Sequence, residues 1–221
     1  MRRRVALRTS ALAWQPSPSP TVWRKRLHLV GEPESGQVTS IVRYEPGARF
    51  PAHDHPDGEE ILVLEGVLCD DHGSWPAGTY LLNPQGFRHA PYSEPGCVLF
   101  VKLRQYAGAG RQHVALRTHE LAWAPSGGAG VEHKILYESP RFPDAMRLEH
   151  WAPHTTRSVP DRAQGAEIFV LDGALEGEAG SLDARAWLRV PVGDALELAT
   201  REGCTLYLKT GGIAALHSAS A

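Results

Sequence analysis

Four residues in the N-terminal half of the chain have the types and the spacing of metal ligands. His53 and His55 are two residues apart, Glu59 follows shortly after, and His89 comes later in the chain. Residues i and i+2 of a strand point to the same face, so the imidazoles of His53 and His55 converge. Three neutral imidazoles and one carboxylate suit a borderline divalent metal ion. The pattern predicts a metal site formed by His53, His55, Glu59 and His89.

The segments that would position these residues have the character of short strands. Residues 38–44, 60–68, 79–82 and 98–103 are rich in β-branched and apolar residues, and turns such as Pro46-Gly47 and Asn83-Pro84 separate them. Turn signals at intervals of about 8–12 residues are typical of sandwiches and barrels, and helical periodicity is weak. We therefore expect an all-β fold, with a mixed α+β fold as the alternative.

The chain contains an internal repeat. Residues 5–9 (VALRT) recur as residues 114–118, and the segment EILVLEG at 60–66 recurs as EIFVLDG at 167–173. Glycines, prolines and a cysteine recur in the same register further along the chain. We infer two tandem copies of one domain, residues 1–107 and 108–221.

The second copy keeps the scaffold of the first but not its candidate ligands. In the register of the second repeat, the four positions are occupied by Pro160, Arg162, Ala166 and Leu196. A joint loss of all four residues is expected if they serve one metal ion. We therefore predict one divalent ion per chain, in residues 1–107, and a metal-free second domain.

These motifs resemble those of cupins, and in particular of the ChrR-type cupin that forms the C-terminal part of zinc-containing anti-sigma factors. Residues 47–66 resemble the first cupin motif, and Gly78, Pro84, Gly86 and His89 resemble the second. The resemblance covers both halves and implies a bicupin, that is, two double-stranded β-helix (jelly-roll) domains. It also implies that His53, His55, Glu59 and His89 are the ligands. The sequence starts directly in the first repeat, so we expect no sigma-factor-binding domain in this chain.

Two functions fit this resemblance. The first is a ChrR-like sensor, regulatory or small-molecule-binding module, in which four protein ligands close a zinc site. The second is a metal-dependent dioxygenase of the Fe²⁺ type, acting on a small organic substrate such as a diketone or a phenolic ketone. Zn²⁺ and Fe²⁺ are the expected ions, with Mn²⁺ and Ni²⁺ as alternatives. The predicted ligand-pocket residues are Arg43, Trp75, Tyr80 and Phe87.

Composition sets the class of protein and excludes some partners. The 221 residues carry 23 Lys and Arg against 25 Asp and Glu, which excludes a nucleic-acid binder that relies on overall basic charge. No apolar run is long enough for a membrane span, and no apolar segment of a secretory leader follows the N-terminal arginines.

Three widely spaced cysteines, Cys69, Cys97 and Cys204, favour a reducing cytoplasm. A homodimer is a further expectation, because many cupins pair through edge strands.

Overall fold

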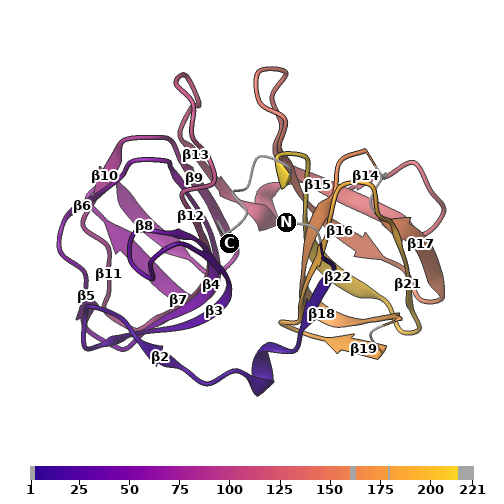
Figure 1. Ribbon diagram of the computed structural model, residues 1–221, viewed down its shortest axis with the longest axis horizontal. Coiled ribbons are helices and arrows are strands. Elements are labelled where there is room, and N and C mark those ends of the chain that lie inside the picture. Colours follow the sequence, from indigo (N-terminus) through magenta and orange to yellow (C-terminus); the bar gives the residue numbers. More distant parts are fainter. Residues whose placement is uncertain (1–2, 160–162, 179, 214–221) are drawn as a thin grey trace. The chain divides into compact units, whose positions relative to one another are not determined.

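The computed structural model describes residues 3–159, 163–178 and 180–213, which divide into two compact units. The first unit comprises Ala13–Glu120, and the second comprises the described residues from Leu121 onward together with those before Ala13. Antiparallel strands form both units, and the helical segments among these residues are two short 3-10 turns, η1 (Thr9–Ala11) and η2 (Thr118–Glu120) (Figure 1). The predicted all-β fold is confirmed. None of the helices in the described residues is long and apolar enough to cross a membrane.

The first unit consists of a large sheet with the order β13-β9-β7-β12-β4-β3-β2 and a separate pair, β6 with β10. Short strands β5, β8 and β11 extend the large sheet. Its strands are β2 (Gln15–Pro16), β3 (Val22–Val30), β4 (Gln37–Tyr44), β5 (Ala48–Arg49), β6 (His53–His55), β7 (Glu59–Asp70), β8 (Gly73–Pro76), β9 (Thr79–Asn83), β10 (Phe87–His89), β11 (Tyr92–Ser93), β12 (Cys97–Leu103) and β13 (Val114–Arg117).

The second unit repeats this arrangement, with the central order β1-β20-β18-β22-β16-β15-β14. Strands β17, β19 and β21 complete it. Its strands are β1 (Val5–Leu7), β14 (Ala124–Pro125), β15 (Val131–Tyr137), β16 (Ala145–Trp151), β17 (Thr155–Val159), β18 (Ala166–Gly177), β19 (Gly180–Asp183), β20 (Trp187–Val190), β21 (Leu196–Thr200) and β22 (Cys204–Thr210).

The two sequence repeats exchange their first strands. β1, at the start of the first repeat, pairs with β20 of the second unit, with Leu7 opposite Trp187. β13, at the start of the second repeat, pairs with β9 of the first unit, with Leu116 opposite Tyr80. Figure 1 shows the indigo β1 among the orange strands of the second unit. Each structural unit therefore contains one strand from the other sequence repeat.

The long strand β7 pairs with different strands along its two halves, and its register is irregular between them. Its N-terminal half pairs with β9 and its C-terminal half with β8, and the register against β12 shifts between Val98 and Leu99. Gly66 lies close to this irregularity with a positive φ of 71°, and a Cβ there would lie 2.0 Å from the carbonyl oxygen of Gly96. Only glycine fits so close an approach. This explains why glycine recurs at Gly173, which has φ 74° in the second unit.

Candidate metal centre

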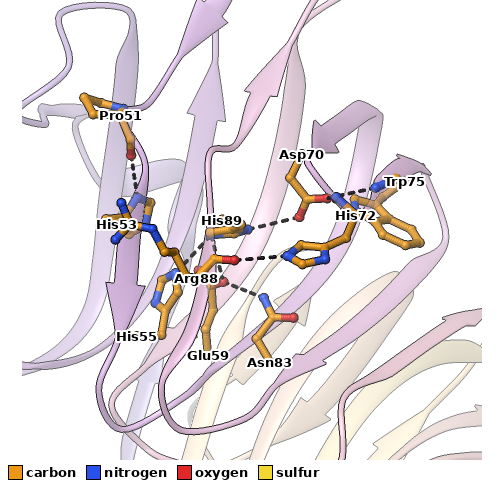
Figure 2. A network of polar contacts seen from close by, with 11 residues as sticks. Pro51, His53, His55, Glu59, Asp70, His72, Trp75, Asn83, Arg88 and His89 are labelled. Atoms are coloured by element: carbon orange, nitrogen blue, oxygen red, sulfur yellow. Dashed lines mark hydrogen bonds and ion pairs between the residues drawn. The ribbon is translucent and has the colours of Figure 1, made fainter.

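The short pair of strands β6 and β10 brings the three histidines together. In its antiparallel register His89 lies directly opposite His53, and His55 follows His53 by two residues on the same strand. Residues in these positions point to one face of the pair. The structure thus confirms that the histidines converge, although they lie far apart in the sequence (Figure 2).

The imidazole nitrogens are close enough to share one metal ion. One nitrogen from each of His53, His55 and His89 lies within 4.8 Å of the others, and the Nε2 atoms of His55 and His89 are 3.0 Å apart. The Nδ1 atom of His53 lies 2.8 Å from the carbonyl oxygen of Pro51, to which it can donate a hydrogen bond. That bond leaves the Nε2 lone pair of His53 for a metal, as a ligating imidazole requires.

Glu59, at the start of β7, adjoins this group of histidines. Its Oε2 atom lies 3.4 Å from Nε2 of His55 and 3.6 Å from Nε2 of His89, and its side chain is buried. Asn83, its register partner on β9, donates a hydrogen bond of 2.9 Å from Nδ2 to the same oxygen. Asn83 therefore holds the carboxylate toward the histidines. That Glu59 is a fourth ligand stays a prediction.

Asp70, at the end of β7, holds His89 from the side away from the other histidines. Its Oδ2 atom lies 3.1 Å from Nδ1 of His89. Its Oδ1 atom accepts hydrogen bonds from the backbone N–H groups of His72 and Gly73 and from the indole N–H of Trp75. A carboxylate on the outer nitrogen of a ligating histidine fixes the tautomer and the orientation of the ring. Asp70 therefore leaves Nε2 of His89 directed at the histidine group.

These surroundings shift the pKa values of the two buried histidines in opposite directions. Burial lowers the pKa of His55, and the charge of Glu59 only partly offsets this effect. Burial also disfavours the charged form of His89, but the hydrogen bond to Asp70 and the charges of Glu59 and Asp70 outweigh it and raise the pKa of His89. Burial acts against ionisation of Asp70 as well, yet its hydrogen bonds, that of His89 foremost, lower its pKa. Asp70 is accordingly an anionic partner for His89 at neutral pH.

A cavity of about 60 Å³ opens beside the histidines, inside the first unit. This volume accommodates a few water molecules or part of a small organic molecule. Most of its wall is apolar and comes from β3, β4, β7 and β12. The lining residues are Val22, Arg24, Ser40, Val42, Tyr44, Phe50, His53, His55, Glu59, Ile61, Leu68, His89, Pro91, Leu99, Val101 and Leu103.

Arg43 and Tyr80, two of the predicted pocket residues, do not line this cavity. Arg43 lies on β4 between two residues that do, so its side chain points to the opposite face, where its guanidinium lies over the ring of Trp14. Tyr80 is fully buried and precedes Leu81, whose side chain belongs to the core of the unit. Strand alternation thus directs both residues away from the histidines.

Trp75 and Phe87, the other two predicted pocket residues, also lie outside the cavity lining. Trp75 packs against the core and donates its indole N–H to Asp70. Phe87 stacks on His113, with ring centroids 5.0 Å apart. Trp75 therefore supports the site indirectly, through the residue that holds His89.

The second unit has no equivalent histidine cluster among its described residues. Ala166 and Leu196 occupy the positions of Glu59 and His89, and both belong to its packed apolar core. Pro160 and Arg162, at the positions of His53 and His55, lie outside the described residues. At the two corresponding positions that the structure describes, apolar core residues thus replace Glu59 and His89 of the first unit.

The sequence interpretation missed the roles of Asp70 and Asn83. Asp70 is not among the candidate residues named from the sequence, yet its Oδ1 atom accepts hydrogen bonds in the turn and its Oδ2 atom contacts His89. The repeat contains a signal for both residues. When the two repeats are aligned so that His89 corresponds to Leu196, Asp70 corresponds to Gly177 and Asn83 to Val190. Both polar residues are absent from the second repeat, as the ligands are.

Comparison with known families shows a match in each half of the chain. Residues 2–107 and residues 111–214 each match the ChrR cupin-like domain family. A search of curated proteins found no match.

Solved structures share the fold at low sequence identity. A protein from Nostoc punctiforme has a TM-score of 0.78 at 15% identity, over 100% of this chain and 87% of that chain. A bacterial pirin from Escherichia coli in complex with nickel(II) has a TM-score of 0.65 at 16% identity, over 95% of this chain and 99% of that chain. Quercetin 2,3-dioxygenase from Acinetobacter baumannii has a TM-score of 0.62 at 13% identity, over 95% of this chain and 78% of that chain. At these identities, the likeness is one of fold.

Proposed function

The chain belongs to the family of ChrR cupin-like domains, and we propose that this bicupin holds one divalent metal ion in its first unit and presents it to a small molecule. The observation that carries this proposal is the group of nitrogens of His53, His55 and His89 within 4.8 Å of one another at the wall of a cavity. Glu59 is the proposed fourth ligand. In this proposal the function is sensing, regulation or small-molecule binding.

The donor set supports a borderline ion. Imidazole nitrogen suits zinc, iron, nickel and copper, whereas a carboxylate also suits manganese. We propose Zn²⁺ or Fe²⁺, with Mn²⁺ and Ni²⁺ as alternatives. The bound ion would supply Lewis acidity to a ligand oxygen. The protein's own contribution is to orient the imidazoles through Asp70 and Pro51 and to shield the site with an apolar wall.

A second candidate function is a metal-dependent dioxygenase for a small organic substrate such as a diketone or phenolic ketone. The cavity beside the histidines favours it, because a catalytic site needs space at the metal for substrate, whereas a purely structural zinc site is closed by its four ligands. The apolar lining suits the carbon skeleton of such a substrate.

The test is the metal content of the full-length protein, purified without added metal and then reconstituted with zinc or iron(II) under anaerobic conditions. One equivalent per chain that is absent from His89→Ala is the expected result. The proposal would be contradicted if the purified protein contained no zinc, iron, nickel or manganese and also took up neither zinc nor iron(II) on reconstitution. Oxygen consumption by the iron-loaded protein with diketones and phenolic ketones separates the two functions, since a binding module consumes none.

A further inference from the structure

The cavity beside the histidines contains one arginine in its wall. Arg24 lies on β3, two residues after Val22, and its register partner on β4 is Val42; all three line the cavity. The side chain of Arg24 is only 12% exposed. A guanidinium is always charged at physiological pH, and holding it against apolar side chains is costly unless an anion pairs with it. An arginine that is mostly buried in this wall therefore needs an anionic partner.

That partner is Glu34, which two arginines share. Nη1 of Arg24 lies 2.8 Å from Oε2 of Glu34, and Nη2 of Arg26 lies 3.1 Å from Oε1. Arg26 also donates to the neutral side-chain amide of Gln15. In this cluster one carboxylate balances two guanidinium groups, so the cluster has an excess of positive charge.

Glu34 is the more exposed member of this cluster. Its side chain is 46% exposed, against 12% and 15% for Arg24 and Arg26. It belongs to the connection between β3 and β4, where the backbone N–H groups of Ser35 and Gly36 donate to the carbonyl oxygen of Glu32. A half-exposed carboxylate in a turn can return to water at little cost, whereas the arginines are fixed by their strand.

We propose that Arg24 anchors the carboxylate of a small apolar acid in the cavity, and that this ligand competes for the guanidinium with Glu34, which pairs with Arg24 but does not line the cavity. The proposal rests on the proposed function, because the same cavity would present the ligand's other end to the metal. It narrows the ligand from any small organic molecule to a compact monocarboxylate with an apolar body.

The rest of the cavity wall is consistent with such a ligand. Val22, Val42 and Leu99 offer apolar contact around Arg24. Tyr44 also lines the cavity, and its hydroxyl is a neutral hydrogen-bond donor. A carboxylate on a guanidinium in such surroundings forms charge-assisted hydrogen bonds, which are stronger than neutral ones.

The experiment is calorimetric titration of the full-length protein, metal-free and zinc-loaded, with isobutyrate and with its neutral isostere isobutyramide. Wild type should bind isobutyrate more tightly than isobutyramide. Arg24→Met should weaken isobutyrate binding about tenfold, the scale of one lost charge-assisted contact, and leave isobutyramide unchanged. Glu34→Gln should tighten isobutyrate binding several-fold, because the competing carboxylate is removed. Arg49→Met, which breaks an exposed pair with Glu94, is the matched control and should change neither.

The outcomes separate this inference from the proposed function. Wild type that takes up zinc but does not bind isobutyrate, or binds both ligands equally, overturns the anion site and leaves the metal site intact. Absence of zinc uptake, with isobutyrate binding that still depends on Arg24, overturns the metal proposal instead. Should Arg24→Met fail to fold, Glu34→Gln decides: unchanged or weaker isobutyrate binding overturns the inference.

Discussion

Nδ1 of His89 lies 3.1 Å from Oδ2 of Asp70, and the other oxygen of that carboxylate is held by three N–H donors. Asp70 is therefore fixed before any metal binds, and it fixes the ring of His89 in turn. The same residue closes the turn after β7 and orients a candidate ligand, so the folding of this hairpin and the geometry of the site are coupled.

Replacing Asp70 by Asn should lower metal affinity about 10- to 100-fold, the usual effect of losing a carboxylate behind a ligating histidine. The amide of Asn keeps the size of the side chain and can still accept bonds from the turn. Competition with a chromophoric zinc chelator measures the change. An affinity equal to that of wild type would show that Asp70 serves the turn alone.

Substitution of the histidines should separate ligands from bystanders. His53→Ala and His89→Ala should each abolish stoichiometric metal binding, because each substitution removes one of the three imidazole ligands and the two that remain hold the ion too weakly. His150→Ala and His154→Ala are the controls, since both residues are exposed and lie in the second unit. Mass spectrometry of the metal content checks both pairs. Full retention of metal in His53→Ala and His89→Ala would contradict the ligand assignment.

Glu59→Gln tests the fourth ligand separately. The substitution keeps the shape but replaces a charged oxygen by a weaker neutral donor. We expect metal still at one equivalent under saturating conditions, with a lower affinity at limiting metal. If the affinity does not change, Glu59 lies beside the metal without binding it, and the site consists of the three histidines.

Metal retention should decrease as the pH falls, because a ligating imidazole must lose its proton. The pKa of His89 is raised above its ordinary value of 6.5, so protons begin to compete with the metal already above that pH. In Asp70→Asn the largest of the interactions that raise this pKa is removed, so the pH below which protons weaken the metal affinity should move down, even though the affinity at pH 8 is itself weaker. Metal content after dialysis between pH 8 and pH 5 measures both curves. A flat wild-type curve would count against histidine ligation.

The exchanged strands predict a crossed pattern of destabilisation. Leu7→Pro should disturb β20, because Leu7 lies opposite Trp187, although the substitution is at the other end of the sequence. Leu116→Pro should disturb β9 instead, through Tyr80. Hydrogen exchange would locate each loss of protection, and each variant is the control for the other. Loss of protection only in the strands nearest in sequence would contradict the exchange.

The sequence was sufficient to predict the all-β fold, the repeat and the convergence of His53 with His55, because these follow from strand patterns, recurrence and local spacing. His89 is distant in the sequence, and its residue type and the resemblance to the second cupin motif placed it in the predicted site. The exchange was not predictable, since residues 5–9 and 114–118 are identical and either segment fits either sheet. The absence of Arg43 from the lining of this cavity has a related reason. Arg43 and Arg24 are both cationic strand residues, and only the register and the covering Trp14 show which one faces inward.

The exchange of β1 and β13 also determines when each unit can be completed during synthesis. The sheet of the first unit lacks its edge strand until residue 117 has been made, and the N-terminal segment must wait for β20 before it has a partner. A gene cut between residues 107 and 108 would encode two halves that each carry the other's strand. Such halves should be poorly folded alone and should reconstitute the protein when they are expressed together.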